Sequence, residues 1–218
     1  MARTVDTTHR DELLNAVAQD LLRGGLVGAS LDRLATAAGT SARMLVHHFG
    51  SRQALLDAAL RRCRDWELSR ARAELPATPD FPRVLATAWT WFSSDEAGQF
   101  FRLFGQLAAS SRLGVDHAGV SRTQLSIEWL TIVGDGFLAC GCPPPLARRL
   151  ATVVVSQIRG LLLDLDATGD QQRVQDAYEG FIKLLVASLA TNRTGTQKAG
   201  EHVTRQLTPE ERKACLDG

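Results

Sequence analysis

Four side chains that could contact nucleic-acid phosphates or base edges fall within a span of ten residues: Arg43, His47, His48 and Arg52. From Arg33 to Leu56 the sequence contains three arginines and no aspartate or glutamate. Acidic side chains would repel phosphates, so this segment forms a local positive patch in a chain whose net charge is only +1. Guanidinium groups recognise phosphates and guanine edges with a planar, two-pronged geometry. The residue types therefore indicate binding of nucleic acid through one local surface.

The individual basic residues each admit more than one interpretation. Arg43 is the strongest candidate for direct recognition of a base, and a simple phosphate contact is its alternative. For His47 and His48 the two interpretations are a phosphate contact and a structural histidine hydrogen-bonded at a helix end. Neighbouring residues on a helix point about 100° apart, so the two imidazoles cannot readily share one ligand. A catalytic or metal-binding histidine pair is therefore disfavoured.

Short helices must position these side chains. Ser30 is a predicted N-cap for a helix that ends at Gly39-Thr40, and Ser41 is a predicted N-cap for a second helix over 42–48. A helix, a tight break and a short helix form the layout of a helix-turn-helix, whose second helix lies in the DNA major groove. Leu45 and Phe49 are four residues apart and are predicted to face inward. The outward face then carries Ala42, Arg43, Met44, Val46 and His47.

The rest of the chain also has helical periodicity, so the predicted fold class is all-α. Beyond the two short helices, the patterns predict helices over 8–23, 51–74, 81–93, 95–112, 119–140, 144–166 and 171–191. Pro76, Pro79 and Pro82 mark a junction between domains. We therefore predict an N-terminal three-helix domain with a connecting helix (1–75), a larger C-terminal helical domain (76–192) and a polar tail (193–218).

Composition places the chain among ordinary globular proteins. Its 218 residues are 44% hydrophobic and 22% charged. The spacing of the four cysteines matches no common metal site, so we expect unpaired thiols, no metal and no cofactor. The longest run without Asp, Glu, Lys or Arg, 136–147, is short and contains three prolines, and the N-terminus has no signal-peptide pattern. These features predict a cytoplasmic protein with no membrane partner.

Aromatic residues concentrate at the start of the C-terminal domain. Seven of the thirteen lie between Phe81 and Phe104. Consecutive pairs such as Trp91-Phe92 cannot point the same way, which favours a cavity between helices, although a simple core is the alternative. Polar groups within these helices, including Glu128, could orient a ligand. Their alternative is a place on the surface. The candidate ligand-binding residues are Trp89, Phe92, Phe101, Arg102, Phe104, Gln106, Trp129, Asp135 and Phe137.

The last two long helices carry apolar rows that could form a subunit interface. Their residues are Leu150, Val154, Ile158, Leu162, Tyr178, Phe181 and Leu185. The same rows could instead close the core of a single chain. Both helices are apolar around much of their circumference, which favours two buried faces, one inward and one against a second subunit. A homodimer would place two recognition helices about 34–36 Å apart, the spacing of successive major grooves.

The run SLDRLATAAGTSARMLVHHFGSRQALLDAAL (30–60) resembles the DNA-binding domain of the TetR family of transcriptional regulators. The matching features are Ser30, Leu34-Ala35, Gly39, the segment His48 to Arg52, and Leu55-Leu56. The resemblance covers about residues 8–62. It implies phosphate contacts by Ser30, His48 and Arg52, and contacts with bases or the groove wall by Ala42, Arg43, Met44 and His47. Val46 stands where the family usually has tyrosine, so His47 could take over part of its task.

The resemblance implies a homodimer that binds a palindromic operator in double-stranded DNA and a small-molecule effector held in the C-terminal domain. We expect a ligand-responsive regulator, most simply a repressor released by an apolar or aromatic effector. The helix over 51–74, with Trp66 near its far end, is the expected lever. Two alternatives remain: a helical protein-interaction module that has lost DNA binding, and an all-helical enzyme. The enzyme lacks support, because the sequence shows no nucleophile elbow, metal-ligand spacing or phosphate loop.

Overall fold

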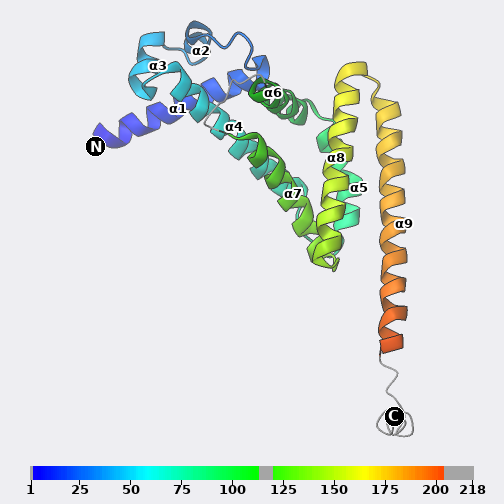
Figure 1. Ribbon diagram of the computed structural model, residues 1–218. Helices are drawn as coiled ribbons and strands as arrows, with labels where there is room; N and C mark the ends of the chain where they lie inside the picture. The colour runs from blue at the N-terminus through cyan, green and yellow to red at the C-terminus, as the bar shows by residue number, and fades with distance from the viewer. Residues whose placement is uncertain (1, 113–119, 204–218) are drawn as a thin grey trace, which may run out of the picture.

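The structure, a computed structural model, describes residues 2–112 and 120–203. Within these ranges every regular element is an α-helix, which confirms the predicted all-α class (Figure 1). The N-terminal part contains α1 (Ala2–Gly24), α2 (Leu31–Ala37), α3 (Ala42–Phe49) and α4 (Arg52–Glu74). The C-terminal part contains α5 (Phe81–Phe92), α6 (Asp95–Arg112), α7 (Arg122–Ala139), α8 (Pro144–Thr168) and α9 (Gln171–Val203).

Three serines begin the helices of the N-terminal part. The hydroxyls of Ser30, Ser41 and Ser51 accept hydrogen bonds from the backbone N–H three residues later, at 3.2, 3.2 and 3.1 Å. Each bond satisfies one of the amide donors that have no partner in the first turn of a helix. Gly39, in the turn between α2 and α3, has φ of 63°. This left-handed conformation favours glycine, so the predicted break and caps are confirmed.

The terminal helices are longer than the sequence predicted. α1 begins at Ala2 instead of near Thr8, and α9 continues to Val203. The segment 193–203, predicted as polar tail, is therefore helical. It contains no proline, so no backbone donor is missing and the helix does not have to end there. Residues 204–218, with a predicted helix start at Thr208-Pro209, lie outside the described residues. No helix within the described ranges is long and apolar enough to cross a bilayer.

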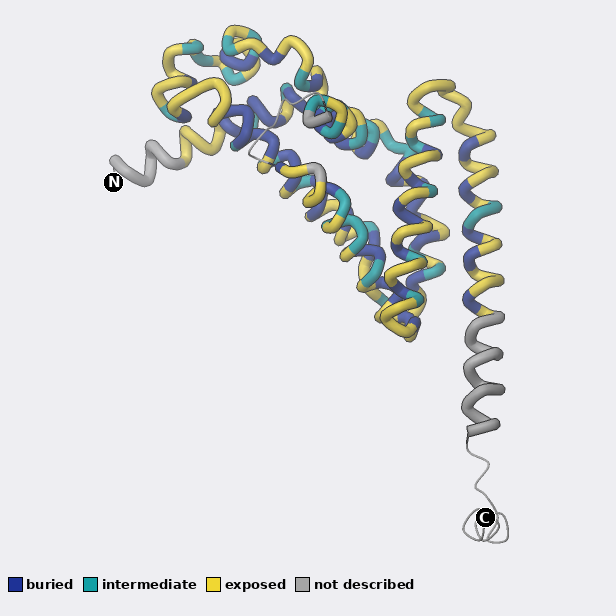
Figure 2. The backbone as a smooth tube through the Cα atoms, viewed as in Figure 1, coloured by how far each residue is buried: buried dark blue, intermediate teal, exposed yellow. Residues whose placement is uncertain are grey.

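The N-terminal core draws on both parts of the chain. Its buried side chains from α1 to α4 include Leu13, Val17, Leu21, Leu34, Leu45, Phe49, Leu55 and Leu56. Phe100, Leu103 and Leu107 of α6 belong to the same buried cluster. α6 therefore packs against the N-terminal helices, and the core extends past the domain junction that the prolines predicted. Figure 2 shows α1, α4 and α6 with their buried sides turned toward one another.

A second core joins the far end of α4 to α5, α7, α8 and α9. Tyr178 of α9 is buried, donates its hydroxyl to the Leu85 carbonyl at 2.6 Å and stacks on Trp89, with ring centroids 4.7 Å apart. These contacts hold α9 against α5. Gly169, with φ of 66°, ends α8, and α9 then runs back beside it (Figure 1). The last two helices thus form an antiparallel pair at one side of the molecule.

Candidate nucleic-acid interface and internal cavity

α3 has a buried side and an exposed side. Leu45 and Phe49 are buried in the N-terminal core, with 0% and 7% of their surfaces exposed. The side chains exposed on the opposite side are Arg43, Met44, Val46 and His47, while Ala42 is half-buried. The whole exposed side of α3 lies at the end of the molecule away from α9 (Figure 2). A surface helix of this kind is suited to insertion into a DNA groove.

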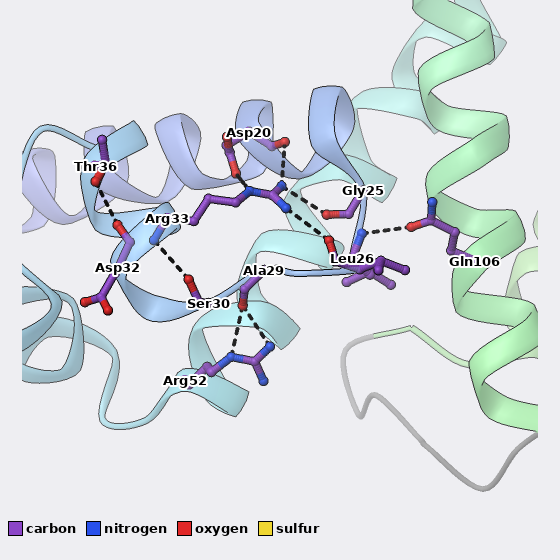
Figure 3. Close-up of polar contacts among 11 residues, drawn as sticks. Asp20, Gly25, Leu26, Ala29, Ser30, Asp32, Arg33, Thr36, Arg52 and Gln106 are labelled. Atoms are coloured by element: carbon purple, nitrogen blue, oxygen red, sulfur yellow. Dashed lines mark hydrogen bonds and ion pairs between the residues drawn. The ribbon is translucent and has the colours of Figure 1, made fainter.

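Arg52 has a structural role that the sequence did not reveal. Its Nε and Nη2 atoms donate to the carbonyl oxygen of Ala29 at 3.0 and 2.8 Å (Figure 3). The guanidinium therefore ties the first turn of α4 to the residue before Ser30. A phosphate contact by Arg52 stays a prediction. The N–H groups that already donate to Ala29 would then be shared with the phosphate, or the remaining N–H groups would make the contact. The Ser30 hydroxyl accepts from the Arg33 amide, which leaves its own O–H as a donor.

Arg33, counted in the basic segment, is an ion-pair residue. Its Nε donates to the Asp20 carboxylate at 2.9 Å, and its Nη atoms reach the carbonyls of Val27, Asp20 and Gly25 (Figure 3). The charge of Arg33 is thereby compensated, and the side chain fixes the loop between α1 and α2. Because Asp20 comes from the preceding helix, the absence of acids between residues 33 and 56 gave no hint of this pairing.

α1 also contributes to the candidate interface, through residues that the sequence did not single out. Arg10 Nε donates to the His48 carbonyl at 3.2 Å, and the guanidinium lies 4.6 Å from the centroid of the Phe49 ring. The half-buried His48 ring packs edge-on against His9 and His47, with centroids 5.7 and 5.4 Å apart. These contacts agree with the structural interpretation of His48. His47 is exposed, and its contact with DNA stays a prediction.

A cavity of about 710 Å³ lies between α4, α5, α6, α7 and α8. Four of the nine candidate ligand-binding residues line it: Phe92, Phe101, Phe104 and Trp129. Trp91 and Phe100, which the sequence analysis placed in the aromatic segment, line it as well. The arrangement therefore provides a space whose walls include six aromatic side chains, of a size that suits a small organic molecule.

The other five candidates lie outside the lining, for separate reasons. Trp89 stacks on Tyr178, and Phe137 packs edge-on against Phe81 with centroids 5.3 Å apart, because both belong to the second core. The exposed Arg102 pairs with Asp166 at 3.4 Å, and Asp135 is exposed. Gln106 binds the backbone of the N-terminal domain. Helical periodicity shows which residues are buried but does not show which buried residues border an empty space.

A buried charged network closes one side of the cavity. Arg64 of α4 donates from Nε to Glu128 at 2.7 Å, from Nη1 to Glu67 and from Nη2 to the Leu125 carbonyl at 3.2 Å. Trp129 Nε1 donates to the second oxygen of Glu67 at 3.1 Å. Only 4% of Arg64 and 6% of Glu67 is exposed, and burial raises the pKa of Glu67. Sequence reasoning did not single out Arg64 or Glu67 and missed this network.

Comparison with known proteins bears on the N-terminal domain first. Residues 13–59, which contain the core of α1, the turn and α3, match the family model described as bacterial regulatory proteins, tetR family. The N-terminal domain belongs to the TetR family. The predicted resemblance is thus confirmed for this domain, and α2 and α3 are the two helices of its helix-turn-helix. None of the curated protein sequences matches the chain.

Solved structures extend the likeness from the TetR-family domain to most of the chain. A transcriptional regulator from Rhodococcus sp. Rha1 has a TM-score of 0.64 and 22% identity, over 82% of this chain and 96% of that one. A TetR-family transcriptional regulator from Rhodococcus sp. has a TM-score of 0.57 and 20% identity, over 81% and 98% of the two chains. The multidrug binding protein EbrR, complexed with imidazole, has a TM-score of 0.54 and 23% identity, over 79% and 88%. At these identities the likeness shows a shared fold.

One polar contact links this TetR-family domain directly to α6. Gln106 Oε1 accepts the backbone N–H of Leu26 at 2.8 Å (Figure 3). A Cβ atom on Gly25 would lie only 2.6 Å from the same oxygen, and Gly25 has φ of 69°. The positive φ favours glycine there, and a side chain at this position would push the Gln106 amide away from the Leu26 N–H. Phe101, Phe104 and Gly105 of α6 line the cavity, so one helix contacts both the cavity and the α1–α2 loop.

We expect Gln106→Ala to loosen the α1–α2 loop. Loss of the bond to the Leu26 amide should cost about 1 kcal/mol, and hydrogen exchange at that amide should become about fivefold faster. Exchange measured by mass spectrometry on peptides covering residues 25–30 checks this. Gln99→Ala, about two turns earlier in the same helix, is the matched control and should leave those peptides unchanged. Equal exchange in the two variants would contradict the expectation.

Proposed function

We propose that the protein is a ligand-responsive transcriptional regulator that binds a palindromic DNA operator through α3 and is released by a small molecule in the cavity. The observation that carries the proposal is the exposed side of α3 in a TetR-family domain, with Arg43 and His47 facing outward and Leu45 and Phe49 anchoring the helix in the core. The roles of Ser30, Ala42, Met44, Val46, His48 and Arg52 are part of the same proposal. Such a regulator would act in the cytoplasm.

Selection of bound DNA tests the DNA-binding part. Purified protein is incubated with sheared genomic DNA that includes the flanks of its own coding region, and the retained fragments are sequenced. We expect enrichment of fragments that share an inverted repeat, with an affinity that falls steeply as salt rises, because phosphate contacts release counterions. No enriched sequence at any salt concentration would instead favour the protein-interaction module.

The proposed effector is a small aromatic molecule. The aromatic side chains around the cavity support this class. EbrR, with a similar fold, has been solved with imidazole and with proflavin, the latter at a TM-score of 0.51. A ligand that prefers a cavity shape in which α6 is displaced would shift the population away from the DNA-binding arrangement, because α6 packs on the N-terminal core. Repression relieved by the effector is the simplest outcome of such a shift.

The proposed homodimer uses a different side of α8 and α9 from the one that the sequence analysis indicated. Of the seven candidate interface residues, Val154, Ile158, Tyr178 and Leu185 are buried within the single chain, and Leu150, Leu162 and Phe181 are partly buried against the same core. These seven side chains already pack inside the single chain, because α8 and α9 cover the second core. The apolar side chains that the two helices leave exposed include Val153 (51%), Leu163 (63%), Leu184 (74%) and Val186 (45%).

Charges on this exposed side should prevent dimerisation. We expect the double variant Val153→Glu, Leu184→Glu to sediment as a monomer where the natural chain sediments as a dimer. Burial of two carboxylates per subunit without partners would cost several kcal/mol. Analytical ultracentrifugation at micromolar concentration measures this. Ala86→Glu, at an exposed position of α5, is the control and should stay dimeric. A double variant that remains dimeric would place the interface elsewhere.

A further inference from the structure

The charged side chains at the cavity wall differ in whether they already have a charged partner. Among the described residues of the lining, three are charged: Arg64, Glu67 and Arg159. Arg64 is committed, because its Nε, Nη1 and Nη2 atoms all donate to oxygens of the protein. The Glu67 carboxylate is committed too, since one oxygen accepts from Arg64 and the other from Trp129. Among the charged side chains of this lining, Arg159 is therefore the one without an oppositely charged hydrogen-bond partner in the described part of the chain.

Arg159 faces only neutral oxygens. From α8 its Nη2 donates to the Leu125 carbonyl at 3.2 Å, and its Nη1 lies 3.5 Å from the Ser126 hydroxyl. No carboxylate among the described residues lies within ion-pair distance of it. Partial burial and the nearby charge of Arg64 lower the pKa of Arg159, and the charge of Glu67 opposes this. A guanidinium has five N–H donors, so several remain for a ligand.

A second donor at the cavity has no acceptor. The indole Nε1 of Trp91 is buried, and the structure gives it no hydrogen-bond partner among the described residues. Trp91 is 6% exposed and lines the cavity. Buried polar groups without partners are costly, but this N–H is covered by protein atoms, so a ligand oxygen would reach it only after the wall had moved. The cavity thus combines aromatic side chains with one cation, Arg159, that has no carboxylate partner among the described residues.

We propose that the cavity selects aromatic carboxylates, with the carboxylate bound by Arg159 beside Ser126 and the rings packed among Phe101, Phe104 and Trp129. This inference rests on the proposed function, because it names the chemical class of the effector. Ser126 and Trp129 lie one turn apart on α7, so the polar and aromatic parts of the site are adjacent. An ion pair that includes hydrogen bonds at a partly desolvated wall gives both affinity and orientation.

Cationic aromatic ligands fit this site less well. The two arginines of the lining would repel a cation, and Glu67 has no free oxygen to receive one. Glu128, which is outside the lining, accepts from Arg64 as well. A cation would have to displace Arg64 from a buried carboxylate, and this exchange would leave the arginine without its partners.

Calorimetric titration of the full-length protein without DNA tests the inference. The probes are 2-naphthoate, the neutral 2-naphthamide of nearly the same shape, and the cation 2-naphthylmethylammonium. We expect naphthoate to bind at least about tenfold more tightly than naphthamide, with the cation weakest, since a charge-assisted hydrogen bond is worth about that factor. Arg159→Gln should bring naphthoate and naphthamide to similar affinities. Arg148→Gln, at an exposed position of the same helix, should keep the preference.

Three results would overturn the inference: equal affinities for naphthoate and naphthamide, a preference for the cation, or a naphthoate preference that survives Arg159→Gln. Binding of none of the probes at millimolar concentration would overturn it too. Far-ultraviolet circular dichroism of each variant establishes that it is folded. Because no DNA is present, a failure of operator binding leaves this titration unaffected. Conversely, a chain that binds an operator but shows no anion preference disproves only the ligand class.

Discussion

Replacement of Arg43 by alanine should weaken binding of the selected operator by roughly 30-fold to 20,000-fold. One arginine that reads a guanine contributes about 1–3 kcal/mol, and a dimer on a palindrome uses it twice. Arg43 is exposed on α3, so its removal should change the free energy of unfolding by less than about 0.5 kcal/mol. Fluorescence anisotropy of labelled operator DNA at one fixed salt concentration measures the loss.

Two further variants separate base recognition from simple attraction. Arg43→Lys keeps the charge but not the planar fork, so it should lose most of the preference for the operator over unrelated DNA. Arg83→Ala, at an exposed position of α5, removes a charge far from α3 and should bind as the natural chain does. A uniform loss on all sequences in Arg43→Ala, with a shallower salt dependence, would assign Arg43 to phosphate. No loss at all would argue against α3 as the recognition helix.

Arg64→Met should destabilise the fold by about 3–5 kcal/mol, because it leaves the buried Glu67 carboxylate without its cation. Equilibrium unfolding in urea measures the change. The double variant Arg64→Met, Glu67→Gln should regain much of the loss, since the remaining side chain is neutral. If the double variant is no more stable than the single one, the cost lies in packing and not in the stranded charge.

The same pair predicts how the loss depends on pH. Burial raises the pKa of Glu67, while the charge and hydrogen bond of Arg64 and the bond from Trp129 oppose that rise. Without Arg64 the folded-state pKa should rise further above the unfolded value. Stability linked to such a raised pKa is complete below the unfolded pKa and is lost as pH rises through the folded pKa. The deficit of Arg64→Met should therefore grow as the pH rises above the unfolded pKa of glutamate, about 4.3; a constant deficit would contradict this.

The features that sequence reasoning found are those that local chemistry determines. Ser30 and Ser41 cap helices because of bonds that span three residues, and Gly39 takes a backbone angle that its neighbours in the chain require. The inward face of α3 follows from the spacing of Leu45 and Phe49. The helix-turn-helix could therefore be predicted almost completely.

The features that it missed depend on contacts between distant segments. Asp20 pairs with Arg33 across a loop, and Arg64 meets Glu128 from another helix. The apolar rows that include Val154 of α8 and Tyr178 of α9 were correctly expected to be buried. Periodicity does not tell whether the helices that cover these rows belong to the same chain or to a second one. The cavity wall could be predicted only as a group of aromatic residues, because four of nine candidates reach it.

Because α6 packs in the cores of both parts of the molecule, the N-terminal domain (α1–α4) is difficult to isolate as a fragment. Phe100, Leu103 and Leu107 complete the interior of the N-terminal helices. A fragment cut after Glu74 would expose to water the apolar surfaces of α1 and α4 that these side chains cover, and it should be prone to aggregate. A fragment of the N-terminal helices alone would thus lack part of its own core. A chimaeric regulator that borrows this domain should therefore include α6.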